Sequence, residues 1–260
     1  MSDAHAHARR VREQFGGSAA AYLTSRLHAG GEDLDRLRAW GAARRGERVL
    51  DVATGGGHTA LAFAGIARRV VAYDLTEPML SAARGHLQSR GAANVDFVAG
   101  DAASLPFSDG AFDIVTCRTA AHHFPDVGAF VRQIHRVLRP GGSLLLQDIL
   151  GHDDAAANAF ILEVERRRDP SHVRSYRMSE WKAFLRAAGL TVMDEHLIWK
   201  IREWDEWTGR MRMTVEARRD LEAFVRRAPE PCRAAFDFKL APDAVVSFND
   251  RQILLRADRD

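Results

Sequence analysis

The stretch RVLDVATGGGH, residues 48–58, decides the fold class of this 260-residue chain. It begins with a short apolar run of the kind that forms a strand buried on both faces of a parallel sheet. It ends in a cluster of glycines, which allow a sharp strand-to-helix turn and the close approach of a ligand to the backbone. A helix is expected next, over residues 57–67. The stretch therefore predicts the first strand–turn–helix unit of an α/β sheet.

Strands and helices are expected to alternate along the rest of the chain. Further strands are expected at 69–75, 95–98, 112–117, 143–149, 191–201 and 244–257, the last of them broken at Asn249-Asp250. Further helices are expected at 7–15, 19–28, 32–43, 77–90, 127–138, 153–168, 179–188 and 203–227. This alternation is typical of a doubly wound α/β fold, in which helices cover both faces of a parallel sheet.

Composition excludes several classes of protein. With 46% hydrophobic and 28% charged residues, the chain can bury a core, so we expect one domain over residues 1–260. No apolar run approaches the roughly 18 residues of a membrane-spanning helix, and no signal peptide is recognisable. A net charge of +2 argues against a dedicated nucleic-acid binder. The two cysteines, Cys117 and Cys232, have no metal-ligand spacing, so we expect a cytoplasmic protein without a metal.

Three aspartates follow three successive expected strands. Asp51, Asp74 and Asp101 are all expected at the carboxyl edge of the sheet, where ligands bind in open parallel sheets. Asp74 is placed to bind the ribose hydroxyls of an adenosine, which suits NAD and S-adenosylmethionine equally. The pattern Gly55-x-Gly57-x-x-Ala60 even matches a dinucleotide fingerprint. Asp51, however, would repel a pyrophosphate and favour the ammonium and sulfonium of S-adenosylmethionine.

Short motifs between residues 48 and 149 resemble those of class I S-adenosylmethionine-dependent methyltransferases. They are VLDVATGGG (49–57), DLT (74–76), GDA (100–102), LPF (105–107), FDIV (112–115) and RVLRPGG (136–142). The branch most similar is that of the ubiquinone/menaquinone-biosynthesis methyltransferases, whose cofactor-covering helix resembles Phe15-Gly16 and Ala21-Tyr22. The resemblance implies a Rossmann-like sheet of seven strands, mostly parallel with an antiparallel last strand, and S-adenosyl-L-methionine as cofactor.

The resemblance also implies which residues bind the cofactor. Those around the methionine part are Asp51, Thr54, Gly55 and Gly57, with Arg118 and Thr119 at its end; those at the ribose are Asp74, Leu75 and Met79; those at the adenine are Asp101 and Ala102. Tyr22 would cover the carboxylate or the sulfonium, although ordinary helix packing explains it equally well.

Histidines supply the candidate catalytic groups. His122 and His123 follow the fourth strand and could take a proton from the methyl acceptor. The alternative is that one of them packs against or caps the next helix. His172 is a further candidate, in a loop expected to fold over the site. The stripe of Trp204, Trp207, Met211 and Met213 is expected to be core, with the floor of an apolar substrate pocket as the second interpretation.

The predicted organisation and function follow from these assignments. Residues 1–45 would cover the cofactor, residues 46–150 would bind it, and the segments 151–178 and 202–242 would select the substrate. The leading hypothesis is methyl transfer by in-line displacement to a small molecule, without nucleic-acid or membrane partners; a homodimer stays open. The alternatives are an NAD(P)-dependent oxidoreductase and a non-catalytic S-adenosylmethionine-binding protein.

Overall fold

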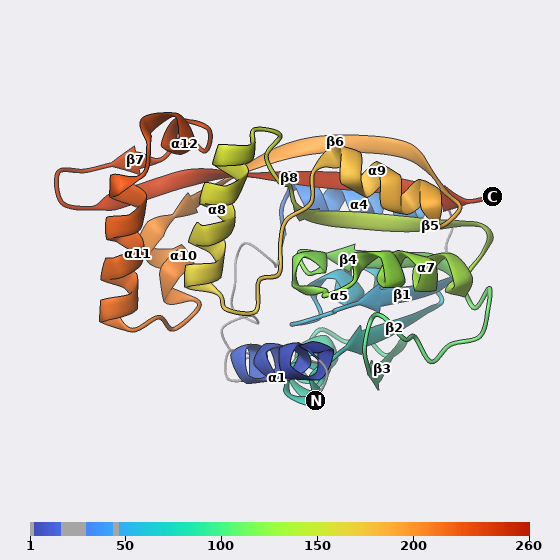
Figure 1. Cartoon of the computed structure of the whole chain (residues 1–260). Coiled ribbons are helices and arrows are strands. Elements are labelled where there is room, and N and C mark those ends of the chain that lie inside the picture. Colours follow the sequence, from blue (N-terminus) through green and yellow to red (C-terminus); the bar gives the residue numbers. More distant parts are fainter. Residues whose placement is uncertain (1–2, 17–29, 44–46) are drawn as a thin grey trace.

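The computed structural model describes residues 3–16, 30–43 and 47–260. Its centre is one sheet in the order β3-β2-β1-β4-β5-β8-β6, with a short strand β7 paired to β8 (Figure 1). The strands are β1 (Arg48–Val52), β2 (Arg69–Asp74), β3 (Val95–Ala99), β4 (Phe112–Arg118), β5 (Leu138–Ile149), β6 (Leu190–Glu203), β7 (Lys239–Leu240) and β8 (Val245–Arg259).

Strands β1 to β5 pair in parallel, and β8 is antiparallel to both of its long neighbours. The predicted fold class, a mostly parallel sheet with an antiparallel strand near the C-terminus, is confirmed. The expected break in the last strand is wrong, because Asn249 and Asp250 pair with Ile201 and Lys200 of β6 within a continuous ladder. β5 also begins at Leu138 rather than at Ser143, since Leu138 pairs with Phe112 of β4.

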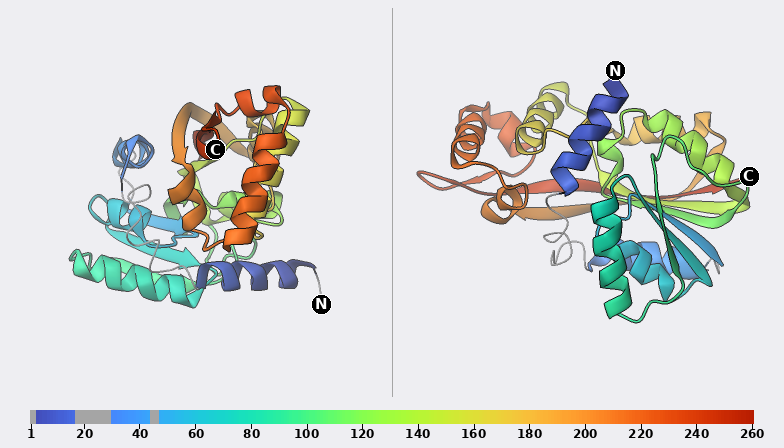
Figure 2. Two further views of the ribbon diagram at one scale, coloured as in Figure 1. Left: turned by 90° about the vertical axis from the view of Figure 1, so that its left-hand side faces the viewer. Right: turned by 90° about the horizontal axis from the view of Figure 1, so that it is seen from below.

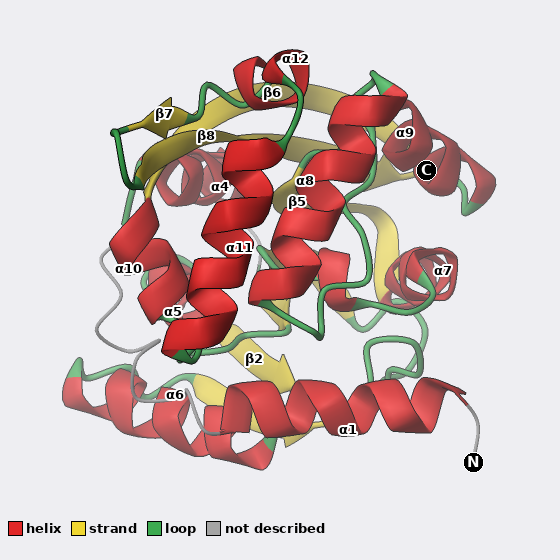
Figure 3. Ribbon diagram, turned by 60° about the vertical axis from the view of Figure 1, so that its left-hand side comes forward, coloured by secondary structure: helices red, strands yellow, loops and turns green. Residues whose placement is uncertain are grey.

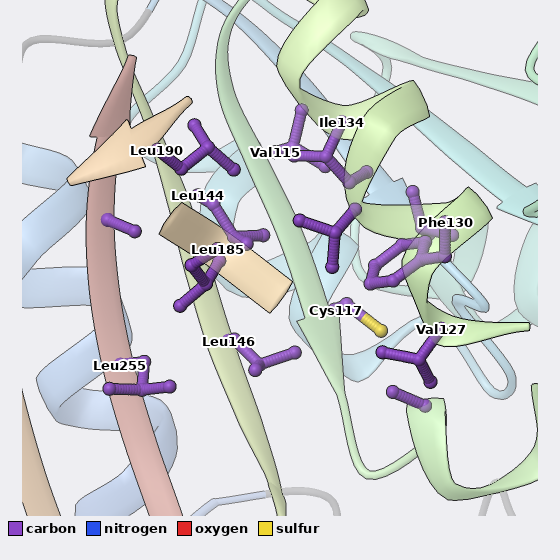
Figure 4. Packing of buried hydrophobic residues seen from close by; sticks show 14 of the residues in the cluster. Val115, Cys117, Val127, Phe130, Ile134, Leu144, Leu146, Leu185, Leu190 and Leu255 are labelled. Atoms are coloured by element: carbon purple, nitrogen blue, oxygen red, sulfur yellow. The ribbon is translucent and has the colours of Figure 1, made fainter. Parts of the chain in front are cut away.

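Helices cover both faces of the sheet. The first face carries α4 (Glu32–Ala43), α5 (His58–Ala64) and α6 (Glu77–Ser89), whose apolar side chains share one core cluster with β1, β2 and β5. The second carries α7 (Val127–Val137) and α9 (Met178–Ala187). Figure 4 shows Phe130 and Ile134 of α7 and Leu185 of α9 against Val115 of β4 and Leu144 of β5. These two clusters hold the strand ends in fixed positions.

A third apolar cluster lies beside the main sheet. Figure 1 shows β6 and β8 extending past the other strands, with α8 (Ala155–Arg168), α10 (Trp204–Gly209), α11 (Val215–Arg227) and α12 (Glu230–Ala234) around the extension. Trp204, Trp207 and Phe248 are buried there with side chains of α8 and α11. The single helix expected over 203–227 is two helices, because the Thr214 hydroxyl accepts the Ala217 N–H and begins α11 anew.

Helix α1 (Asp3–Gly16) lies across the edge of the molecule beside α6 and below α10 and α11 (Figures 2 and 3). The helix expected over residues 19–28 falls outside the described residues. A 3₁₀ turn that the sequence did not predict, η1 (Ala121–His123), follows β4. Within the described part of the chain, no helix is long and apolar enough to cross a membrane.

Candidate active site

A cavity of about 280 Å³ lies at the carboxyl ends of β1, β2 and β4. One wall is made by the loops that follow these strands, a second by α1, and a third by residues of α8, β6 and α10 with the turn after it. The volume is close to the lower end of the range for small-molecule sites. The cavity therefore lies where a parallel sheet binds ligands, between the sheet edge and the late helices.

Most of the predicted site residues meet in this cavity. Its lining includes Asp51, Thr54, Gly55, Asp74, Leu75, Met79, Asp101, Ala102, Arg118, Thr119, His122 and His123. Gly57 does not line it, and Tyr22 lies outside the described residues. The structure thus brings together residues from four strand ends that are far apart in the sequence.

The two outer glycines of the loop have different roles. Gly55 has φ +53°, and a Cβ built there would meet nothing within 4 Å. Gly57 has φ +80°, and a Cβ there would lie 2.4 Å from Leu87 Cδ1 of α6. Gly55 therefore keeps the cavity wall open, whereas Gly57 lets the loop pack against a helix.

Asp51 places a buried carboxylate on the cavity wall. It is 2% exposed, and it accepts hydrogen bonds from the hydroxyls of Thr54 and Thr116, both at 2.6 Å. Burial raises its pKa to about 6, although the two hydroxyls act in the opposite direction. Among the described residues no cation lies within ion-pair distance of it, although the charge of Arg118 also lowers its pKa. A positively charged ligand group would therefore be stabilised beside Asp51.

Asp74 ties the glycine loop to the end of β2. Its Oδ2 accepts the Gly55 N–H at 2.9 Å, and its Oδ1 accepts the N–H and the hydroxyl of Thr76, each at 3.0 Å. Burial raises the pKa of this carboxyl, against these hydrogen bonds. Asp101 differs, because its side chain is exposed and its Oδ1 accepts the Ala103 N–H at 2.8 Å. Both carboxylates line the cavity, one buried and one open to solvent.

Arg118 is held by a buried acid that sequence reasoning missed. Its Nε and Nη2 lie 2.9 and 2.8 Å from Oδ2 of Asp33 in α4, which also lies 2.9 Å from Lys200 Nζ of β6. Burial alone would raise the pKa of Asp33, but the two cations lower it. Thr119 has φ +54° and donates its hydroxyl to Gln147 Oε1 at 2.7 Å. No local sequence pattern links Asp33 to this strand end.

His122 forms a buried dyad with Asp148 of β5. Its Nδ1 lies 2.6 Å from Asp148 Oδ1, and its backbone N–H donates to Oδ2 at 2.9 Å. Because a carboxylate only accepts, Nδ1 carries the proton and Nε2 is left as an acceptor. Burial alone would lower the pKa of His122, but Asp148 reverses the shift, and the net direction is upward. Asp148 was not among the predicted site residues, although its position at the carboxyl end of the strand beside β4 could have indicated it.

His123 lines the cavity as a neutral imidazole. Its Nδ1 donates to the Ser171 carbonyl at 3.1 Å, and its Nε2 lies 3.9 Å from Asp169 Oδ2. Burial and the neighbouring His122 lower its pKa to about 4. His172 is buried, stacks on His122 with ring centroids 4.9 Å apart, and does not line the cavity. Of the three histidines, His122 and His123 can reach a ligand.

The late helices complete the site. Trp207 and Met211 line the cavity together with Arg168 and Arg202, while Trp204 packs in the third apolar cluster. Both interpretations of the tryptophan and methionine stripe therefore apply: Trp204 and Met213 are core, Met211 lines the cavity, and Trp207 does both. The loops after β1 and β2 thus form an acidic wall, and the turn after β4 together with Arg168 and Arg202 forms a second wall of histidines and arginines.

The chain is similar to proteins named as methyltransferases, and to one of them along most of its length. The family described as "Methyltransferase domain" matches residues 50–146. YcgJ of Bacillus subtilis, an uncharacterized methyltransferase, is 36% identical over 244 residues, which cover 93% of this chain and 96% of YcgJ. The ubiquinone/menaquinone biosynthesis C-methyltransferase UbiE of Pseudomonas putida is 38% identical over 151 residues, which cover 54% of this chain and 57% of UbiE.

Two solved structures share the fold. That of YcgJ gives a TM-score of 0.84 at 35% identity, covering 87% of this chain and 97% of the other. A structure from Bacillus halodurans C-125, named as that of a methyltransferase, gives a TM-score of 0.85 at 41% identity, covering 88% and 99%. The similarity to YcgJ extends over the late helices, whereas the similarity to UbiE covers about half of each chain.

Proposed function

We propose that this chain, which belongs to the family of S-adenosylmethionine-dependent methyltransferases, methylates a small molecule by in-line displacement within the cavity. The cavity is bounded by helices on two sides, and this supports an acceptor of small size. The near-neutral charge supports neither a nucleic-acid nor a membrane partner. We expect the enzyme to act in the cytoplasm.

The Asp51 carboxylate carries the assignment of the cofactor. It is buried on the cavity wall, and its hydrogen bonds come from hydroxyls rather than from a cation. The ammonium and sulfonium of S-adenosylmethionine would supply positive charge there, whereas the pyrophosphate of NAD(P) would bring a second negative charge. An oxidoreductase is therefore disfavoured.

The residues proposed to hold the cofactor lie at four strand ends. Asp51, Thr54 and Gly55 would surround the methionine part, with Arg118 and Thr119 at its end; Asp74, Leu75 and Met79 would face the ribose; Asp101 and Ala102 would face the adenine. Gly57 would act indirectly, by keeping the loop against α6. The role of Tyr22 stays a prediction. When bound, S-adenosylmethionine supplies a methyl group activated by its sulfonium.

His122 is the proposed general base for an acceptor that arrives protonated. Asp148 orients the ring and raises its pKa, so Nε2 can accept a proton from a hydroxyl, an amine or an activated carbon acid. His123, neutral and held by Ser171, would accept a hydrogen bond from the acceptor and orient it. An oriented acid–histidine pair on the cavity wall favours an enzyme over a protein that only binds the cofactor.

Two measurements test this function. Calorimetry with S-adenosylmethionine is expected to give one site per chain, and methyl-labelled cofactor mixed with a metabolite extract is expected to yield a labelled small product identified by mass spectrometry. The His122→Ala variant should bind the cofactor and form little product. A folded chain that does not bind S-adenosylmethionine would overturn the proposal.

A further inference from the structure

Arg202 of β6 lines the cavity and has one guanidinium nitrogen that the described residues leave without a hydrogen bond. It is 7% exposed, and its Nε and Nη2 both donate to Asp250 Oδ2 of β8, at 3.1 and 2.6 Å. Within the described ranges, its Nη1 makes no hydrogen bond to the protein. Arg202 lines the cavity, so this third nitrogen is available to a ligand.

Arg168, the last residue of α8, also lines the cavity and also has one guanidinium nitrogen that the described residues leave without a hydrogen bond. Its Nε donates to the Trp207 carbonyl at 3.0 Å, its guanidinium lies 4.4 Å from the centre of the Trp207 ring, and its Nη1 lies 3.4 Å from Glu165 Oε2. Its Nη2 has no hydrogen-bond partner among residues 3–16, 30–43 and 47–260. The stacked, hydrogen-bonded guanidinium is thus fixed in orientation, with one edge left for a ligand on the cavity wall.

Three acids lie near these arginines: Asp250 pairs with Arg202, Asp169 follows Arg168 and has its pKa lowered partly by it, and Glu165 is affected by both arginines. Glu165 is buried near them, and the charges of Arg168, His122 and Arg202 act to lower its pKa. Burial raises the pKa of Glu165, so this acid offsets the arginines less than an exposed glutamate would. These acids largely offset the two guanidinium charges, so the arginines offer a ligand fixed, charged hydrogen-bond donors close to the proposed base.

Apolar side chains also line the cavity. Val11 and Phe15 of α1 line the cavity from one side, and Met211 lines it from the other. The Phe15 ring makes an edge contact with His123, with ring centroids 5.0 Å apart. An acceptor here would have an apolar body between α1 and Met211 and one charged end.

We propose that the methyl acceptor is an apolar, ring-containing acid whose carboxylate binds Arg168 Nη2 and Arg202 Nη1. Paired guanidinium donors suit the planar carboxylate, and the carboxylate replaces the hydrogen bonds that water would otherwise make to these nitrogens. The carboxylate fixes the acceptor beside His122, with the acceptor atom toward the acidic wall. This inference rests on the proposed function.

The test compares 2-naphthoate with 2-naphthamide, which differ in the charged group and share the ring. Each is titrated by calorimetry into the full chain saturated with S-adenosylhomocysteine. We expect the acid to bind at least tenfold more tightly than the amide. Equal binding of acid and amide, with S-adenosylhomocysteine bound normally, would overturn the acceptor class and leave the proposed function intact. Failure to bind S-adenosylhomocysteine would overturn the proposed function itself.

Matched variants separate binding from a purely structural ion network. Arg202→Gln with Asp250→Asn removes both charges of the buried pair, so neither is left unpaired, and it should abolish the preference for the acid. Arg69→Gln with Asp96→Asn makes the same change in an exposed pair and should keep the preference. Arg168→Gln should weaken the preference several-fold, and Arg168→Lys should restore part of it. A preference unchanged in the Arg202 double variant and in Arg168→Gln would contradict the proposal.

Discussion

The acidic wall and the second wall, made by histidines and arginines, are held by contacts of different range. On the acidic wall, Asp51 is bonded to Thr54, three residues away, and Asp74 to Thr76, two residues away. On the other wall, His122 is bonded to Asp148 across 26 residues, and Arg202 to Asp250 across 48. The first wall combines such contacts within single turns with contacts between neighbouring strand ends, from Thr116 to Asp51 and from Gly55 to Asp74. The second is held by contacts between distant segments.

The two walls also differ in charge. The acidic wall offers carboxylates to a cationic ligand, and the second wall offers a histidine base and arginines to an acceptor. If this division is correct, substitutions on the acidic wall should change cofactor binding. Substitutions on the second wall should change turnover or acceptor binding. The following predictions test that separation.

The largest effect is expected from His122→Ala. Loss of a positioned general base should lower kcat by about 100-fold or more, while the dissociation constant of S-adenosylmethionine stays within about twofold. Steady-state kinetics with the identified acceptor, together with calorimetry, measure both quantities. Asp148→Asn should shift the acid limb of the kcat profile to lower pH, because the carboxylate raises the pKa of His122. An unchanged kcat in His122→Ala would show that His122 is not the general base.

Asp33→Ala should cause the next largest change, in stability. It leaves the buried Arg118 and the nearby Lys200 without their shared acid, so we expect a loss of about 3 kcal/mol in the free energy of unfolding. Urea denaturation monitored by circular dichroism measures it. The control is Asp96→Ala, which breaks the exposed pair with Arg69 and should cost at most about 1 kcal/mol. Equal costs would mean that Arg118 is not anchored as the structure indicates.

Asp51→Asn should affect affinity and stability in opposite directions. Removing the charge should weaken S-adenosylmethionine binding by about 30-fold or more. The free energy of unfolding at pH 8 should stay equal or rise, because ionisation of this buried acid opposes folding. Calorimetry and thermal denaturation measure the two effects. Asp96→Asn makes the same substitution at the surface and should leave affinity unchanged; a loss of both affinity and stability in Asp51→Asn would point to simple misfolding.

The raised pKa of Asp51 predicts a pH dependence of cofactor binding. Its pKa is about 6, so protonation should weaken binding of the cationic cofactor by up to about tenfold for each pH unit below that value. Folding stability depends on pH in the opposite way. The pKa of Asp51 is higher in the folded chain than in the unfolded chain, so the free energy of unfolding falls as the pH rises from about 4 to above 6. Calorimetry between pH 5 and pH 8 tests the binding, and a flat profile would contradict the role of Asp51.

The smallest effects should separate the two loop glycines. Gly55→Ala places a methyl group in the open cavity and should weaken S-adenosylmethionine binding by several-fold, at a cost in stability of about 1 kcal/mol for the positive φ. Gly57→Ala meets Leu87 of α6 and should cost more stability than Gly55→Ala. Calorimetry and urea denaturation compare the variants. The reverse ranking in stability would mean that the loop does not pack on α6 as described.

Sequence patterns predicted the acidic wall far better than the second wall. Asp51, Asp74 and Asp101 each follow an apolar run, and a parallel sheet brings such positions to one edge regardless of the remaining contacts. Asp33 and Asp148 were missed because their importance depends on the partners Arg118 and His122, which no local period reveals. Gly57 was assigned to the ligand since the pattern of glycines does not show that Leu87 lies against it.

Strands β8 and β6, the last two strands at one edge of the sheet, extend as a pair past the other strands to the late helices. Their register runs from Leu190 opposite Arg259 to Glu203 opposite Ser247, with one irregularity near Val192. The late helices are therefore connected to the sheet by a continuous pair of strands rather than by a hinge. To change the acceptor by engineering, one would keep this pair of strands and replace side chains on it, such as Arg202. The acidic wall would stay unchanged.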